Sequence, residues 1–119
     1  MRIVMLVLLS TLLLGTPQAN AHARLVRASP AVDSTVHASP AQVTLWFTER
    51  LESAYSTIEV RDQAGNRVDQ GDRQVDNRDP TVLRVSLKPL LPGTYAVRWR
   101  VISVDGHPEK GDFAFRVEP

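Results

Sequence analysis

Hydrophobic and polar residues alternate over most of the chain. From Val43 to Phe47, every second residue is apolar, and a longer stretch from Tyr95 to Val101 repeats the pattern. Because successive side chains of an extended chain point to opposite faces, a period of two predicts strands that cover a core with one face. We expect seven strands: residues 24–28, 42–48, 57–61, 67–70, 81–87, 95–101 and 112–118.

Turn-forming residues separate these strands. The chain has a Pro break after Ser29, a hairpin turn at 63–66 and a polar stretch at 71–80 that we expect to be an exposed loop. A Pro-Gly turn precedes Tyr95, which is typical of the tyrosine corner of immunoglobulin-like sandwiches. Helical periodicity is absent after the N-terminal segment. The prediction is an all-β, immunoglobulin-like Greek-key β-sandwich or barrel of about seven strands.

Residues 1–21 follow a different pattern. Arg2 precedes an apolar run from Ile3 to Leu14, and the segment ends in Ala19-Asn20-Ala21. A basic start, a short apolar run and a small-x-small ending predict a secretory signal peptide that is removed after Ala21. The alternative is an uncleaved membrane anchor, but the run is shorter than the roughly 20 residues that a spanning helix needs. We therefore expect an exported domain of residues 22–119 that is not embedded in a membrane.

Composition limits the chemistry of this domain. The chain has no Cys, which excludes disulfides, thiolate metal sites and cysteine nucleophiles. Its 14 basic and 13 acidic side chains argue against a nucleic-acid-binding protein. Both methionines, Met1 and Met5, lie in the predicted signal peptide. A metal site in the exported domain must therefore use nitrogen and oxygen ligands, which excludes a soft site selective for Cu(I).

Two histidines stand at informative positions. Cleavage would make His22 the first residue, so that its α-amine and ring Nδ1 can chelate one metal ion in a six-membered ring. Asp105 and His107 follow the 95–101 strand and share a side in an extended chain, at the end of the sandwich where we expect a pocket. An amine, two imidazoles and a carboxylate favour Cu(II) over other divalent ions.

Other readings of these residues stay open. The Asp-Gly pair before His107 is also a common surface turn, and His37 lies in a polar loop as an expected surface residue. Glu49 ends its strand on the inward face and is either a carboxylate beside the metal or an exposed strand-end acid. Two alternative functions are an immunoglobulin-like structural or interaction module without metal and a copper-dependent oxidative enzyme, such as a lytic polysaccharide monooxygenase. We expect a binding protein and not an enzyme.

A set of short motifs runs through residues 22–119: His22, Ser29-Pro30-Ala31, Val43-x-Leu45-x-Phe47 with Glu49, Leu91-Pro92-Gly93-Thr94-Tyr95-x-Val97-x-Trp99-Arg100, Ser103-x-Asp105-Gly106-His107-Pro108 and Gly111-x-Phe113-x-Phe115-x-Val117. In this combination of motifs the chain resembles the CopC family of bacterial periplasmic copper-binding proteins.

The resemblance implies a periplasmic protein that holds one Cu(II) ion for copper transport, homeostasis or resistance. Its ligands would be the amine and imidazole of His22, together with Asp105 and His107. The chain lacks the Met-rich loop through which some members bind Cu(I), and so resembles the Cu(II)-only members. An inner-membrane copper transporter of the CopD type is the expected partner.

Overall fold

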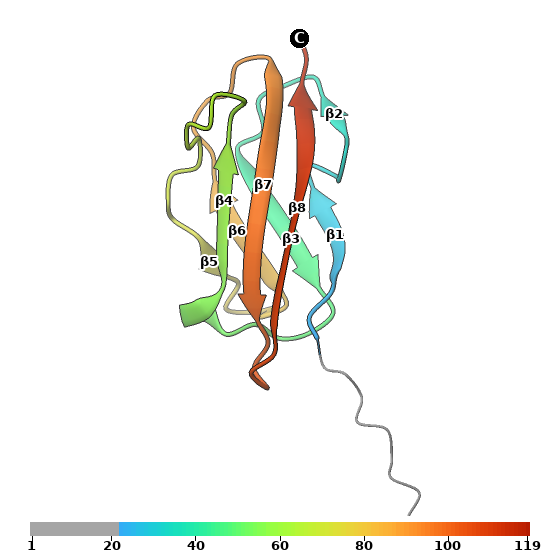
Figure 1. Ribbon diagram of the computed structural model, residues 1–119, viewed down its shortest axis with the longest axis vertical. Coiled ribbons are helices and arrows are strands. Elements are labelled where there is room, and N and C mark those ends of the chain that lie inside the picture. Colours follow the sequence, from blue (N-terminus) through green and yellow to red (C-terminus); the bar gives the residue numbers. More distant parts are fainter. Residues whose placement is uncertain (1–21) are drawn as a thin grey trace, which may run out of the picture.

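Two four-stranded sheets pack face to face in the computed structural model, which describes residues 22–119 (Figure 1). Eight strands and one turn of 3-10 helix, η1 (Ser53–Tyr55), make up its regular structure within these residues. The first sheet has the order β1 (Leu25–Ser29), β3 (Gln42–Phe47), β6 (Val82–Ser86) and β5 (Gln74–Val75). The second has the order β2 (Thr35–Val36), β8 (Pro108–Val117), β7 (Gly93–Ile102) and β4 (Thr57–Arg61).

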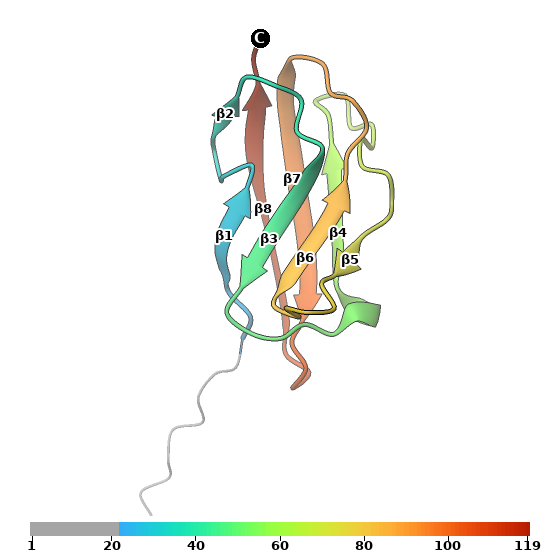
Figure 2. The same cartoon turned by 180° about the vertical axis from the view of Figure 1, so that it is seen from behind.

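The strand order is that of an immunoglobulin-like Greek key. β3 pairs with β6 and β4 with β7, all antiparallel, so the chain crosses twice between the sheets before these partners meet. β7 and β8 form the longest ladder, and the short β2 runs parallel to the end of β8. Figure 2 shows the β1–β3–β6–β5 sheet from its outer side. The predicted all-β sandwich is confirmed.

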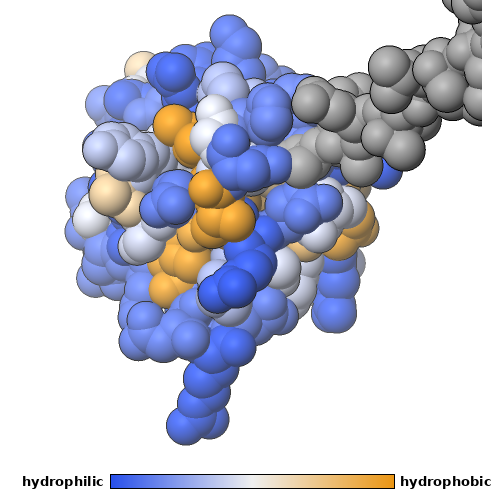
Figure 3. Space-filling view, turned by 90° about the horizontal axis from the view of Figure 1, so that it is seen from below, coloured by the Kyte–Doolittle hydropathy of each residue, from blue (hydrophilic) through white to orange (hydrophobic). Residues whose placement is uncertain are grey.

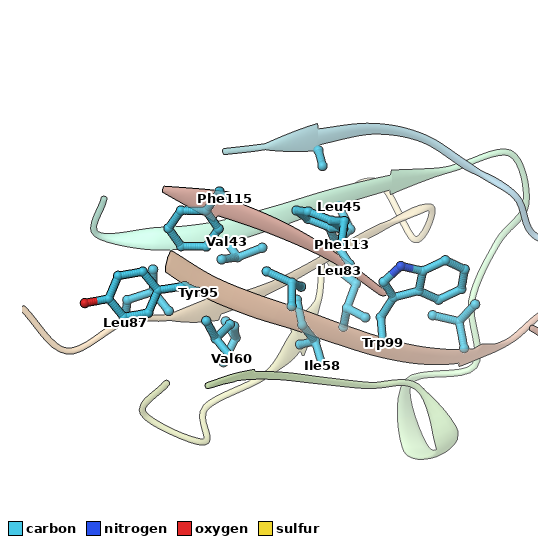
Figure 4. Packing of buried hydrophobic residues seen from close by; sticks show 14 of the residues in the cluster. Val43, Leu45, Ile58, Val60, Leu83, Leu87, Tyr95, Trp99, Phe113 and Phe115 are labelled. Carbon is cyan, nitrogen blue, oxygen red and sulfur yellow. The ribbon is translucent and has the colours of Figure 1, made fainter. Parts of the chain in front are cut away.

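The core lies between the inward faces of the two sheets (Figure 4). The expected alternation is present: Val43 and Leu45 of β3 are fully buried, as are Val97 and Val101 of β7. Aromatic rings add directional packing, because Phe47 meets Trp99 edge to face, with ring centroids 5.1 Å apart. A rigid sandwich of this kind fixes where its strand ends lie, and therefore where the loops between them meet.

The tyrosine corner is also present. The Tyr95 hydroxyl donates a hydrogen bond of 2.5 Å to the Leu91 carbonyl, four residues upstream. Nearer the other end of β7, Trp99 lies opposite Gly111 of β8, and a Cβ on that glycine would overlap the indole ring. Gly111 therefore leaves the space in which Trp99 covers that end of the core.

Some predicted boundaries were wrong. Residues 67–70 form no strand, since only isolated bridges from Arg67 and Asp69 pair there. Residues 71–80 contain β5, which the charged sequence around Val75 conceals. β2 was missed because two residues cannot display an alternating pattern. β8 begins at Pro108, four residues earlier than expected, because pairing with β7 extends it through a polar stretch.

The predicted signal peptide, residues 1–21, lies outside the described residues.

A buried carboxylate closes the loop between β4 and β5. Asp69 is 3% exposed, and its Oδ2 accepts hydrogen bonds from the Val60 N–H at 2.8 Å and from Arg67 Nε at 2.9 Å. Its Oδ1 accepts from the Gly71 N–H at 2.9 Å and from Arg67 Nε at 3.0 Å. Burial alone would raise the pKa of Asp69, but these hydrogen bonds and the Arg67 charge outweigh it and hold the pKa below its ordinary value.

Candidate metal centre

The turn between β7 and β8 carries two of the predicted site residues. It runs from Ser103 to His107 and is closed by hydrogen bonds of its own backbone. The Gly106 N–H donates to the Ser103 carbonyl at 2.8 Å, and the Ser103 N–H donates to the His107 carbonyl at 3.1 Å. Gly106 has a φ of +89°, in the left-handed region that glycine adopts without strain. The sequence therefore dictates a tight turn at this position.

Asp105 and His107 meet across this turn. Oδ1 of Asp105 lies 3.4 Å from Nδ1 of His107. We expected the two side chains to share a side of an extended strand, and that prediction was wrong, because the chain reverses direction between them. The expected pocket was wrong too, since the side chains are 41% and 50% exposed and lie on the surface. The two groups are therefore open to an ion from solvent.

Buried Ser103 holds the Asp105 carboxylate. The Ser103 side chain faces the core end and is 1% exposed, and its hydroxyl donates a hydrogen bond to Oδ1 of Asp105. This hydrogen bond, with a smaller contribution from the His107 imidazole, lowers the pKa of Asp105 below its ordinary value. The carboxylate is thus kept in its ionised form, which is the form that binds a metal ion.

The start of the described chain reaches the same end of the sandwich. Thr48, directly after β3, pairs with Arg24 through two hydrogen bonds of 2.9 Å, one from the Arg24 N–H to Oγ1 and one from the Thr48 N–H to the Arg24 carbonyl. Ala23 is fully buried in the core. These contacts place the His22 ring beside the His107 ring, with centroids 4.9 Å apart and planes inclined by 63°.

The segment after β3 joins the two halves of this site. Its first residue, Thr48, binds the N-terminal segment, and its Arg50 carbonyl accepts the Val104 N–H at 2.9 Å. Leu51 then forms a bridge with Ser103. One crossing between the sheets therefore contacts both sequence-distant parts of the site. In Figure 3 this end of the molecule shows mostly hydrophilic residues, with several hydrophobic residues among them.

The structure brings together His22, Asp105 and His107 only in part. His107 contacts each of the other two, but no three His, Asp or Glu side chains within residues 22–119 form a metal-binding group. His37 lies at the other end of the sandwich, since it follows β2, which pairs with Val117. Glu49 is half-buried on the joining segment, and no hydrogen bond or ion pair links it to the three within the described residues.

Sequence reasoning did not single out the two hydroxyl residues that hold the site. Ser103 fixes Asp105, and Thr48 fixes the backbone beside His22. A polar residue at a core-facing position, as Ser103 is in the alternating pattern, signals a buried hydroxyl that needs a partner. Thr48 offers no comparable signal, because its contact is 24 residues away in sequence.

One nitrogen of the site has no hydrogen-bond partner among residues 22–119. Nδ1 of His22 is buried and makes no hydrogen bond to any described residue. An unpaired buried polar atom is costly, and a metal ion is one group that satisfies an imidazole nitrogen. In a chain that begins at His22, Nδ1 would be the ring nitrogen that closes a six-membered chelate with the α-amine of the same residue. The donor set of nitrogens and one carboxylate therefore fits a borderline metal ion such as Cu(II).

Comparisons with known proteins identify relatives of this chain. The family model of the CopC domain matches residues 25–118. Protein YobA of Escherichia coli (strain K12) is 37% identical over 106 residues, covering 88% of this chain and 86% of that protein. Copper resistance protein C of Xanthomonas campestris pv. juglandis is 37% identical over 111 residues, covering 88% and 87% of the two chains.

A solved structure gives the same fold. The crystal structure of CopC from Methylosinus trichosporium OB3b superimposes with a TM-score of 0.77 at 39% sequence identity, over 82% of this chain and 95% of that one. At this identity the likeness extends beyond fold to common descent. Within residues 22–119, no helix reaches the length and hydropathy that crossing a membrane would require.

Proposed function

Because the chain belongs to the CopC family, we propose that it is a copper carrier that holds one Cu(II) ion. The ligands are the α-amine and Nδ1 of His22, a carboxylate oxygen of Asp105 and an imidazole nitrogen of His107. The amine arises when residues 1–21 are removed as a signal peptide on export to the periplasm. Copper is bound and released unchanged, so the protein is a carrier and not an enzyme.

The observation that carries this proposal is the buried, unpartnered Nδ1 of His22 beside the His107 ring. In the uncleaved chain the nitrogen of His22 is an amide, which is a poor ligand. Cleavage converts it to an amine, and loss of its proton at a pKa of about 8 makes it a donor. His22 and Asp105 both contact His107, so the three proposed ligand residues lie at the same end of the sandwich.

The comparisons support copper as the cargo. One relative is named copper resistance protein C, and another, of which this chain matches 18%, is the copper transport protein CutJ of Bacillus subtilis. The described residues contain no Met, so a thioether site for Cu(I) has no ligands here. An inner-membrane transporter of the CopD type is the proposed recipient or donor.

A Cu(II) titration of the protein beginning at His22 tests the proposal. The titration is run against a competing chelator, with electron paramagnetic resonance of the complex. We expect one site and a tetragonal spectrum with nitrogen hyperfine splitting. Weak, multiple or oxygen-dominated binding would contradict the proposal and favour an immunoglobulin-like module without a metal site.

One extra Gly before His22 tests the amine ligand separately. The extension keeps every side chain but moves the amine away from the imidazole, so the chelate ring is lost. We expect Cu(II) affinity to fall by more than about 100-fold, beyond the usual effect of changing an outer partner of a metal ligand. Unchanged affinity of the extended protein would show that the amine does not bind the metal.

Two histidine variants test the location of the site. His107→Ala removes a proposed ligand, whereas His37→Ala removes an exposed histidine at the opposite end of β8. We expect His107→Ala to weaken Cu(II) binding by at least about 100-fold and His37→Ala to leave it unchanged. Equal losses in the two variants would place the copper elsewhere.

A further inference from the structure

Ser103 occupies an unusual place for a serine. Its side chain is 1% exposed, at the end of β7 where the core meets the turn that carries Asp105 and His107. A buried hydroxyl needs hydrogen-bond partners, since leaving one unpaired destabilises the folded protein. Both partners that Ser103 finds belong to the turn, not to the core.

The hydroxyl connects the two proposed ligand residues of the turn. Its single proton is donated to Oδ1 of Asp105, and its oxygen accepts the His107 N–H at 3.3 Å. The same Oδ1 lies 3.4 Å from Nδ1 of His107. These contacts use one oxygen of the carboxylate and one nitrogen of the ring. Oδ2 of Asp105 accepts no hydrogen bond from the described residues and stays open to an ion.

This arrangement limits the freedom of an otherwise exposed carboxylate. The Asp105 side chain is 41% exposed and would rotate among its staggered conformers if nothing held it. A partner anchored in the core fixes one conformer before any metal arrives. Fixing a ligand in advance removes an entropy cost from binding, as outer partners of metal ligands generally do.

We propose that Ser103 is a positioning residue for the Cu(II) site, which sets the Asp105 carboxylate and the His107 backbone in their binding arrangement. This inference rests on the proposed function. It predicts that removing the hydroxyl weakens copper binding, although Ser103 itself does not touch the ion.

Ser56 provides a matched control. It is the other fully buried serine at this end of the sandwich, and its hydroxyl accepts the Ile102 N–H at 3.3 Å. Its hydroxyl makes no hydrogen bond with Asp105 or His107 among the described residues. Ser103→Ala and Ser56→Ala each remove one buried hydroxyl near the end of β7, because Ser103 directly follows Ile102 and the Ser56 hydroxyl accepts the Ile102 N–H. Only Ser103→Ala removes a hydrogen bond to Asp105.

The test compares Cu(II) affinity and the electron paramagnetic resonance spectrum of wild type, Ser103→Ala and Ser56→Ala, each beginning at His22. We expect Ser103→Ala to raise the Kd by about 10–100-fold and to alter the copper hyperfine splitting, with Ser56→Ala like wild type in both. Wild-type affinity and spectrum in Ser103→Ala would overturn the role of Ser103. Equal losses in both variants would also overturn it, because they would indicate a general loss of structure.

A second measurement needs neither a variant nor a metal. Side-chain scalar couplings of Asp105 in the metal-free wild-type protein should report a single χ1 conformer. Couplings averaged over several conformers would overturn the inference even if Ser103→Ala fails to fold. A wild-type protein that binds no Cu(II) but shows a fixed Asp105 would instead overturn the proposed function, with the positioning of Asp105 by Ser103 left as a feature of the turn alone.

Discussion

Two aspartates of this protein have similar sequence surroundings but differ in exposure and in the hydrogen bonds that their carboxylate oxygens accept. Asp69 and Asp105 each lie two residues after a side chain that hydrogen-bonds them, Arg67 in one case and Ser103 in the other. Each has a pKa below its ordinary value. Yet the Asp69 side chain is 0% exposed and that of Asp105 is 41% exposed.

The difference lies in which oxygens are already used. Both oxygens of Asp69 accept hydrogen bonds from within the protein, from Arg67 and from the backbone of Val60 and Gly71. Asp105 uses Oδ1 alone, in a turn open to solvent. An acid whose oxygens are all paired stabilises the fold, whereas an anchored acid with a spare oxygen at the surface can serve a ligand. A lowered pKa by itself does not separate the two roles.

The largest effect is expected from Asp69→Ala. The change leaves the buried Val60 N–H without its acceptor and releases the loop that Arg67 and Gly71 close. We expect the free energy of unfolding to fall by about 3 kcal/mol, from one unpaired buried donor and lost hydrogen bonds to a charged group. Urea unfolding measures this loss, and Cu(II) affinity of the folded fraction should be unchanged.

Asp62→Ala is the control for that prediction. In the part of the chain that the structure describes, its carboxylate accepts only the Asn66 N–H, at 2.9 Å in an exposed turn. The loss of this carboxylate should therefore cost less than about 1 kcal/mol. A stability of Asp69→Ala equal to that of Asp62→Ala would mean that water replaces the partners of Asp69. The contrast between the two aspartates would then be lost.

Asp105→Ala should show the reverse pattern. It removes a proposed ligand but leaves no buried donor except the Ser103 hydroxyl, which can turn to the His107 carbonyl at 3.3 Å. We expect Cu(II) affinity to fall by more than about tenfold, with the free energy of unfolding changed by less than about 1 kcal/mol. A variant that binds copper normally, or one that unfolds as easily as Asp69→Ala, would contradict the assignment of Asp105.

The fold could be predicted where a strand buries one face. Residues 57–61 were placed correctly because Ile58 and Val60 alternate with polar neighbours on a half-buried strand. The stretch 71–80 was not, because its only buried apolar residue is Val75, and pairing with Leu83 creates β5. Short edge strands depend on a partner that no local pattern encodes.

The candidate site was predictable in its residues and not in its geometry. His22 and the pair of Asp105 and His107 stood out by chemistry and spacing, and the fold brings both histidine rings within 4.9 Å of each other. The turn at Gly106 was predicted as extended chain, because the alternation of buried and exposed residues along β7 does not indicate where the strand ends. The holding contacts of Thr48 and Ser103 come from tertiary packing, which a single sequence does not display.

The smallest expected effect is the pH dependence that Asp69 gives to stability. Its pKa in the folded protein is lowered, whereas in the unfolded chain it returns to about 3.9. Its contribution is therefore complete above the unfolded value and is lost as pH falls through the folded value. The loss should be smaller than that in Asp69→Ala, because a protonated carboxyl still fills its space and still accepts through one oxygen.

Urea unfolding of wild type and Asp69→Asn at pH 7 and at pH 3 measures this term. Asp69→Asn cannot ionise, so its free energy of unfolding should fall less between the two pH values than that of wild type. Asp62→Asn, in its exposed turn, serves as the control and should fall as wild type does. If the free energy of unfolding falls equally in wild type and Asp69→Asn, the hydrogen bonds of Asp69 do not depend on its charge. Asp69 would then stabilise the contact between β4 and the following loop only as a neutral hydrogen-bond acceptor.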